Sequence, residues 1–323
     1  MREFAFELAL CAHLEAETDA VVSRQLGAGV RKPGGRVVDT VIVEPGAAVD
    51  ARAAITPASI PIAAAESDVG PGRFRPANRA LDGPPERVDR IVDRAVEVGF
   101  FERERRNGRD YVRQVARYPD WVDRIVGIEN KPDLGRPGDL ETQLRTDASL
   151  AVLDAVVLAT ESYVTGAHRN RLPDPVGIWR FDPDSGDREV VREPDPLDPE
   201  GPGVELLDRS PGRAEVRIVS PGEKERARTR IAERAYGKGW RTYRFPACER
   251  IESDDAARPY CGWKERVVDP ASECSEACPG HVEAPVQRVD RASARAARQP
   301  WKPDPDGRVR RQSGLDRFSG QDT

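Results

Sequence analysis

The chain has 323 residues, of which 33% are charged and 38% hydrophobic, and its formal net charge is −5. This length predicts two or three compact units with room to bury a core. No apolar run is long enough to cross a bilayer, and the N-terminal stretch lacks the charged start and cleavage site of a signal peptide. We therefore exclude a membrane protein and expect a cytoplasmic, reducing setting, which disfavours disulfides.

Sequence motifs also exclude several enzyme classes. The chain shows no phosphate-binding loop and no dinucleotide-binding glycine pattern. Its three histidines, His13, His168 and His281, stand in no recognisable pair with a serine or cysteine nucleophile. Arginine supplies 45 of the 51 basic residues and lysine only six. A lysine inside a motif is therefore a candidate for chemistry that needs a compact ammonium group.

The N-terminal part predicts a helix and then a strand, each with an acid among apolar residues. Residues 3–11 are largely apolar and contain Glu7, and residues 36–43 form a β-branched run with Asp39 in its middle. An unpaired buried carboxylate is costly, so Asp39 needs a metal or another partner. Glu7 can be interpreted as a surface charge of this helix.

The long segment after Asp39 predicts an inserted module over residues 45–119. A short helix or turn at residues 60–65 precedes a helix from Pro84 to Gly99, and two strands follow around an Asn-Gly turn. A helix followed by a basic hairpin resembles a winged-helix unit, which can hold duplex DNA. The arginines that would then meet phosphates are Arg90, Arg94, Arg103, Arg105, Arg106 and Arg109. A solvated face balanced by neighbouring acids, or a protein contact, explains them equally well.

The Glu129-Asn130-Lys131 triplet is the most informative motif of the chain. It ends a short apolar run, and residues two apart on a strand project to the same face. Most such triplets are solvated ion pairs, so its surroundings decide the interpretation. A Pro/Gly break leads to an amphipathic helix over residues 139–150 and then to a buried aliphatic strand over residues 154–161. The order strand, helix, strand predicts a parallel or mixed sheet.

Residues 36–161 resemble the core of the PD-(D/E)XK nuclease superfamily. In that family one strand supplies an Asp, a neighbouring strand supplies Glu-x-Lys, and a helix crosses to a further strand. The resemblance implies an α/β fold, a mixed sheet flanked by helices, with the nuclease-like core in residues 1–44 and 120–192.

The resemblance also implies roles for particular residues. Asp39 and Glu129 would hold Mg²⁺ or Mn²⁺, Lys131 would lie near the attacking water or the scissile phosphate, and Glu7 would be a further metal-site carboxylate. Gln143 matches the start of a Gln-x-x-x-Tyr signature in a RecB-like branch of the superfamily. Asp147 stands where that signature has tyrosine, so the chain departs from the branch at this position.

The C-terminal half predicts smaller elements around four cysteines. We expect a hairpin within residues 176–191, a loop over residues 192–203, a solvated helix over residues 223–236 and an alternating strand over residues 240–245. The cysteines of the segment 204–285 are Cys248, Cys261, Cys274 and Cys278.

Soft thiolates of this kind select zinc or an iron–sulfur cluster, and a closed four-ligand site can fold a lobe that lacks its own core. Zinc is favoured because the four cluster together, with His281 as a substitute ligand. The alternatives are buried thiols, disulfides, or a 4Fe-4S cluster in which Cys11 replaces Cys248, as in some RecB-like nucleases.

The tail, residues 286–323, is rich in Pro, Gly, Gln, Ser and Arg and predicts disorder. The excess of Arg, Asp and Glu is similar to that of haloarchaeal cytoplasmic proteins, whose molar salt would restrict DNA binding to close contacts. We predict a metal-dependent DNA nuclease of repair, recombination or defence. The alternative is a non-catalytic DNA-binding or regulatory protein that uses the winged-helix module, and an RNA substrate is a third interpretation. DNA is the expected partner.

Overall fold

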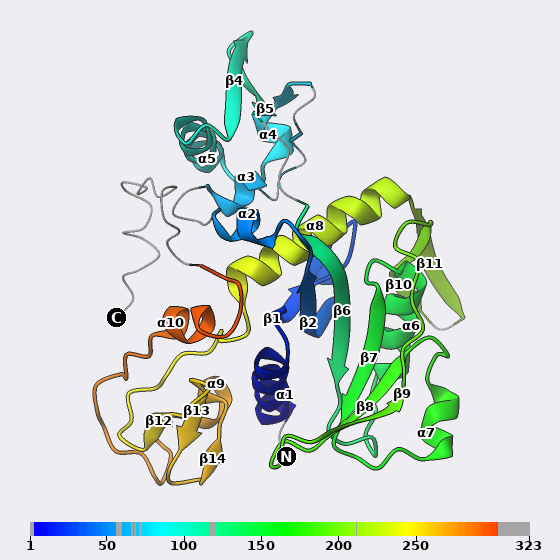
Figure 1. Cartoon of the computed structure of the whole chain (residues 1–323), viewed down its shortest axis with the longest axis vertical. Helices are drawn as coiled ribbons and strands as arrows, with labels where there is room; N and C mark the ends of the chain where they lie inside the picture. Colours follow the sequence, from blue (N-terminus) through cyan, green and yellow to red (C-terminus); the bar gives the residue numbers. More distant parts are fainter. Residues whose placement is uncertain are drawn as a thin grey trace. The chain divides into compact units, whose positions relative to one another are not determined.

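A six-stranded mixed sheet organises the larger part of the chain (Figure 1). In this computed structural model the strands lie in the order β1-β2-β6-β7-β8-β9. The β6-β7 and β7-β8 pairs are parallel, and the β1-β2 and β8-β9 pairs are antiparallel. The strands are β1 (Val21–Gly27), β2 (Val37–Pro45), β6 (Val122–Asn130), β7 (Ala155–Thr160), β8 (Gly177–Phe181) and β9 (Arg188–Arg192). The structure describes residues 3–55, 60–65, 67, 69–70, 73–115, 120–210 and 212–302.

The chain divides into two compact units. The first, here called the sheet unit, comprises Met1–Glu44 and Asp123–Gln299. The second, here called the inserted unit, comprises Pro45–Val122 together with the chain from Pro300. The inserted unit lies between β2 and β6 in the chain, and the sequence analysis placed an inserted module at residues 45–119. The strands that flank the insertion, β2 and β6, are neighbours in the sheet.

The centre of the sheet follows the predicted order of strand, helix and strand. Helix α6 (Leu140–Leu150) connects β6 to β7, whose six residues are all buried. A strand covered on both faces reads as a continuous aliphatic run, which is why this segment was predictable. The helix ends at Ala151, which takes the left-handed conformation at φ 48°. The predicted hairpin of β8 and β9 is also confirmed.

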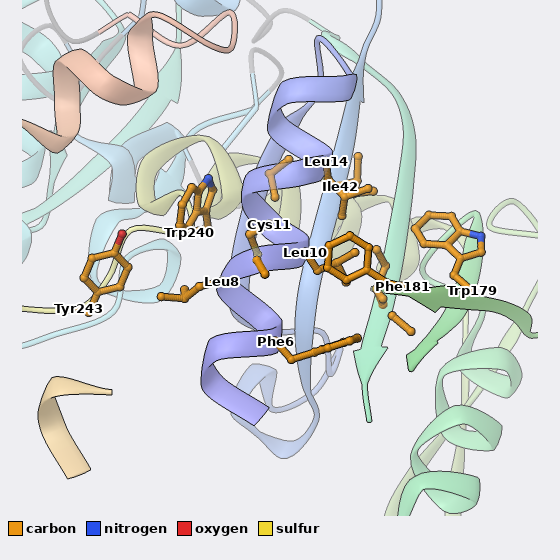
Figure 2. Packing of buried hydrophobic residues seen from close by; sticks show 14 of the residues in the cluster. Phe6, Leu8, Leu10, Cys11, Leu14, Ile42, Trp179, Phe181, Trp240 and Tyr243 are labelled. Atoms are coloured by element: carbon orange, nitrogen blue, oxygen red, sulfur yellow. The ribbon is translucent and has the colours of Figure 1, made fainter. Parts of the chain in front are cut away.

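Helix α1 (Glu3–Glu17) is buried on several sides because it lies between two parts of the sheet unit. Figure 2 shows Phe6 and Leu10 pointing toward Phe181 of the sheet, whereas Leu8 points toward Tyr243. The Phe6 and Phe181 rings meet edge to face, with centroids 5.7 Å apart. A helix packed in this way needs apolar side chains around most of its circumference.

The segment that carries Tyr243 was predicted as a strand and is not one. Residues 240–245 make no strand pairing, although Trp240, Tyr243 and Phe245 are buried in the core against α1. The alternating spacing correctly indicates which side chains are buried, but the backbone forms hydrogen bonds with groups other than a neighbouring strand. Tyr243 carbonyl oxygen, for example, accepts a hydrogen bond from Arg291 Nη1.

Helix α8 (Pro221–Lys238) was predicted as solvated but has one fully buried face. Ala227, Ile231, Ala232, Ala235 and Tyr236 are at most 1% exposed. The helix packs along β1, to which it is tied by Lys238 Nζ donating to the carbonyl oxygens at positions 24 and 25. The buried face was not predicted because it consists largely of alanines, which do not give the strong hydrophobic periodicity of a typical buried helix face.

The remaining elements of the sheet unit lie mostly toward the C-terminus. Strands β10 and β11 form a separate antiparallel hairpin, and β12, β13 and β14 form a small sheet. These elements are α7 (Gly166–Arg171), β10 (Gly203–Ser210), β11 (Arg213–Val219), β12 (Ile251–Ser253), β13 (Pro259–Cys261), β14 (Arg266–Val267), α9 (Pro270–Glu273) and α10 (Arg291–Ala296), with the 3₁₀ turn η1 (Pro33–Gly35) near the start.

The tail differs from the predicted disorder over its first part. Helix α10 lies within residues 286–302, where Arg295 and Gln299 are buried. Gln299 Nε2 donates to Glu15 Oε1 at 3.0 Å, so a distant contact orders the segment. The rest of the predicted tail, residues 303–323, lies outside the described residues.

The inserted unit combines short helices with a three-stranded sheet of order β3-β5-β4. The predicted long helix and hairpin are confirmed, and Asn107 and Gly108 at the turn have φ of 50° and 74°. The elements are α2 (Val49–Ala53), α3 (Ile62–Ala65), β3 (Arg75–Pro76), α4 (Ala77–Ala80), α5 (Pro85–Glu97), β4 (Phe101–Arg106) and β5 (Arg109–Gln114).

Within the described parts of both units, no helix has the length and apolar character that crossing a membrane requires.

Candidate active site

Arg36 joins two buried carboxylates, one from the sheet and one from α6. Its Nε and Nη2 donate to the two oxygens of Asp147 at 2.9 and 2.6 Å, and Nη2 also binds Glu129 Oε1. Glu129 is 3% exposed and Asp147 is 2% exposed. Burial raises the pKa of both carboxyl groups, and Arg36 opposes this rise. Burial together with the charge of Asp39 raises the pKa of Glu129 to about 8.

Asp39 lies in β2 beside the same cluster but is bound by neutral donors. Its Oδ1 accepts from Gln25 Nε2 at 3.2 Å, and its Oδ2 accepts from the backbone nitrogen of Asn130 at 3.0 Å. It is only partly buried. Because the Asp39 charge raises the pKa of Glu129, the two carboxylates lie close enough to interact. The structure therefore brings the predicted metal ligands Asp39 and Glu129 together.

Glu7 joins this group through Gln25. The side chain is 4% exposed, so the surface-charge interpretation of Glu7 is wrong. Its Oε2 accepts from Arg24 Nη2 at 2.7 Å and its Oε1 accepts from Gln25 Nε2 at 3.1 Å. Burial raises the pKa of Glu7, and Arg24 works in the opposite direction. The Gln25 amide thus donates to both Glu7 and Asp39, with its backbone in the left-handed region at φ 53°.

The charges of this cluster do not balance when its acids are ionised. We call the group of Glu7, Asp39, Glu129 and Asp147 the carboxylate cluster. The two guanidinium groups bound to it belong to Arg24 and Arg36. The Lys238 ammonium also interacts with the charge of Glu7, so four negative charges face three positive charges. The remaining excess of negative charge lies in a site of low dielectric, where it is costly. A proton near neutral pH, a divalent cation or an added ammonium group would reduce it.

Lys131 follows directly on β6, and its position is fixed by the backbone around it. Its amide nitrogen donates to the carbonyl oxygen of Ala159 at 2.9 Å, which continues the pairing with β7. Thr160 Oγ1 and Ser162 Oγ donate to the carbonyl oxygen of Pro132, at 3.2 and 3.0 Å. Residues two apart share a face, so Lys131 follows Glu129 on the side of the sheet that faces Asp147. No ion pair of the Lys131 ammonium is formed with another described residue.

Gln143 is not part of the contacts around the cluster. It lies one helical turn before Asp147 on α6 and is partly exposed. Its backbone nitrogen donates to Asp139, and no side-chain hydrogen bond links it to the four acids in the described structure. The catalytic role suggested for Gln143 by the resemblance therefore stays a prediction.

Asp147 and Arg36 were not predicted as site residues, although Asp147 carried a usable signal. It shares the apolar face of its helix with Leu140, Leu144 and Ala151, at spacings of seven, three and four residues. An acid on a buried face requires a partner. Nothing in the local sequence indicates that this partner is Arg36, which directly precedes β2.

The four C-terminal cysteines are placed together, and Cys11 is placed elsewhere. Cys248, Cys261, Cys274 and Cys278 all line one cavity of about 510 Å³. Cys11 is fully buried in α1, where its Sγ lies 3.6 Å from Thr40 Oγ1. Cys11 does not line that cavity. The described structure therefore gives no support to an iron–sulfur ligand set that contains Cys11.

No three His, Cys, Asp or Glu side chains of the described residues form a group that could hold a metal ion in this arrangement. This finding applies to the carboxylate cluster, where the arginines engage Glu7, Glu129 and Asp147. It applies equally to the cysteines.

A family model described as "Family of unknown function (DUF5787)" matches residues 21–283, so the chain belongs to this family. The matched range includes Asp39, Glu129, Lys131 and the four cysteines of the cavity, and it begins after α1. No curated protein and no solved structure matches the chain.

Proposed function

We propose that this protein is a divalent-metal-dependent nuclease that hydrolyses phosphodiester bonds in DNA. The observation that carries the proposal is the uncompensated charge of the carboxylate cluster beside a lysine that follows Glu129 by two positions. A purely structural ion-pair network would be expected to contain as many cations as acids. Here the acids outnumber the cations even when Lys238 is counted, and a divalent cation would offset the excess negative charge.

Asp39 and Glu129 are the residues that would hold the ion. Asp39 is bound by neutral donors alone among the described residues, and Glu129 contributes only Oε1 to Arg36. Mg²⁺ typically uses one or two carboxylates and completes its shell with waters and substrate phosphate oxygens. Two carboxylates therefore suffice, and a group of three is not required. When bound, the ion lowers the pKa of a coordinated water and offsets charge on the phosphate.

The other residues of the site act on position and charge. Arg36 holds Glu129 and Asp147 in fixed orientations through its planar, forked guanidinium group. The Lys131 ammonium would stabilise the negative charge that develops on the phosphate, or orient the attacking water. The hydrogen bond from its backbone nitrogen to Ala159 fixes the point at which this side chain leaves the sheet.

The inserted unit supports a DNA substrate through its topology. After α2, its elements follow the order α3-β3-α4-α5-β4-β5, with β3 paired to β5, which resembles a winged helix with β4 and β5 as the wing. Arg90, Arg105 and Arg109 are exposed and would meet phosphates.

Three other arginines of the predicted set are already engaged. Arg94 is 4% exposed and pairs with Glu97, Arg103 pairs with Asp93, and Arg106 pairs with Glu104. Residues 45–122 contain 13 Arg and 12 Asp or Glu, so their net charge is close to neutral. DNA binding would therefore depend on the positions of individual arginines, not on overall attraction.

Cleavage of supercoiled plasmid with Mg²⁺, with Mn²⁺ and with excess EDTA tests the proposal. We expect cleavage with either ion and none with EDTA. Lys131→Met and Asp39→Asn should each lower the rate by at least about 100-fold, the scale typical of a lost charge-stabilising group. The matched controls are Lys32→Met and Asp123→Asn, because both residues are exposed in the sheet unit.

Binding of plasmid without cleavage under all of these conditions would overturn the proposal. It would favour the non-catalytic DNA-binding protein that the sequence left open. Cleavage that survives Lys131→Met would refute the role of that ammonium. A parallel reaction on single-stranded RNA decides the nucleic acid.

A further inference from the structure

The cysteine lobe, residues 246–283, presents its four thiols to one space from separate loops. Cys248 precedes β12, Cys261 ends β13, Cys274 follows α9, and Cys278 lies in the next turn. Together they line the cavity of about 510 Å³. None of the four forms a disulfide. Thiols scattered through a core as small hydrophobes would not be expected to converge on a cavity.

Three of the four cysteines begin a tight turn. The carbonyl oxygen of Cys248 accepts from the backbone nitrogen of Ile251 at 3.2 Å. Cys261 accepts in the same way from Lys264 at 3.2 Å, and Cys278 accepts from His281 at 2.9 Å. The shared local geometry places each of these cysteines at the first position of a turn at the cavity wall. Such repetition indicates a common role for the side chains.

The four thiols share one cavity wall with a single lysine, Lys264. Four thiolates in one cavity would repel one another unless a cation offset their charge. Lys264 supplies one positive charge, but its Nζ also donates to the carbonyl oxygen of Glu273 at 3.1 Å.

His281 adds a fifth donor on the cavity wall. Its Nε2 lies 3.2 Å from the carbonyl oxygen of Ala247, which can only accept, so Nε2 carries a proton and Nδ1 remains for another partner. A histidine that binds a metal usually donates its other ring N–H to a carbonyl or carboxylate in this way.

We propose that Cys248, Cys261, Cys274 and Cys278 ligate a thiophilic metal centre, either a zinc ion or an iron–sulfur cluster, with His281 beside it. Both centres use four thiolates. A single zinc ion needs sulfur atoms about 2.3 Å away. Because the described side chains do not meet that geometry, zinc would bind with movement of the loops toward the ion. An iron–sulfur cluster is larger than a single zinc ion, so the loops would need to move less for the four sulfur atoms to reach it.

The metal centre would stabilise a lobe that has little regular structure of its own. Its strands have three, three and two residues. A bound metal contributes its binding free energy to folding where the site is absent from the unfolded chain. This inference does not depend on the nuclease proposal, since its ligands and its measurements are separate from the carboxylate cluster.

Metal analysis of the full-length protein, purified without oxygen, tests the inference. We expect either about one zinc per chain or about four iron atoms with equal sulfide and visible absorption. Protein isolated without metal would be incubated with zinc alone, and separately with iron and sulfide. Cys274→Ser and Cys278→Ser should each lower the bound metal by at least about tenfold. Cys11→Ser is the matched control and should retain it.

A second measurement follows the lobe itself. Tryptic cleavage after Arg250, Lys264 and Arg266 should be slow in the metal-loaded protein and fast after chelation or in Cys274→Ser. Protein that takes up no metal in either reconstitution, or binds metal equally well in all three variants, would overturn the inference. Zinc and iron results distinguish the two centres.

Discussion

Replacement of Arg36 by Met is the sharpest test of how the carboxylate cluster is held together. Met keeps much of the aliphatic stem but removes the group that binds both Glu129 and Asp147. Breaking a buried pair by removing one partner costs about 3–5 kcal/mol, because the other charge stays buried and uncompensated. Two carboxylates lose their partner here, so we expect a loss in this range at pH 8. At pH 5 the loss should be smaller, since both carboxyl groups can then take up protons.

The assay is urea unfolding followed by far-ultraviolet circular dichroism in buffer with EDTA. The matched control is Arg145→Met, because Arg145 lies on the exposed face of α6 and forms an ion pair with Glu141, at side-chain exposures of 57% and 53%. An exposed pair at this spacing contributes only about 0.3–0.5 kcal/mol. If Arg36→Met is as stable to urea at pH 8 as the control variant, Arg36 does not hold Glu129 and Asp147 together as described. Added Mg²⁺ should restore part of the loss in Arg36→Met, because the cation substitutes for the missing charge.

Two further predictions concern the cluster and the packing beside it. Because the pKa of Glu129 lies at about 8 in the folded protein and at 4.5 for the free side chain, its ionisation opposes folding, and this destabilisation grows as pH rises from about 4.5 to 8. In EDTA, the free energy of unfolding of Glu129→Gln should therefore rise relative to that of the unaltered protein across this pH range. The exposed control Glu141→Gln should show no such rise. Parallel plots of unfolding free energy against pH for Glu129→Gln and the unaltered protein would show that Glu129 does not titrate in this range. Gly203→Ala places its Cβ 2.1 Å from the carbonyl oxygen of Leu150, so we expect thermal unfolding at a clearly lower temperature. Gly34→Ala, with nothing within 4 Å, is its control, and equal melting temperatures would contradict the packing of β10 against α6.

The sequence predicted those parts of the fold in which local pattern and tertiary role coincide. Strand β7 was recognisable because a strand buried on both faces needs an uninterrupted aliphatic run. The turn at Asn107-Gly108 was recognisable because these residues tolerate positive φ. In both cases the residue type is demanded by the backbone and its immediate surroundings, so no knowledge of distant contacts was required.

Prediction failed where distant contacts decide the structure. Residues 240–245 alternate like a strand, yet their side chains anchor an unpaired segment against α1. Residues 286–302 have the composition of a disordered tail, but α10 and Gln299 are held by contacts such as the one to Glu15. Composition measures how much apolar surface a segment can bury and does not register polar contacts to residues far away in the sequence.

The candidate site shows the same division at the level of single residues. Asp39 and Glu129 were predictable because an acid within an apolar strand is costly without a partner. Arg36 was not, because an arginine at a strand entrance is equally consistent with a solvated charge. Asp147 illustrates the consequence. A tyrosine at this position, as in the RecB-like signature, could not form the two-oxygen contact with Arg36, and Arg36 would then be shared by fewer acids. The aspartate thus adds one negative charge to the cluster, and without this charge the acids and cations would be balanced at three of each.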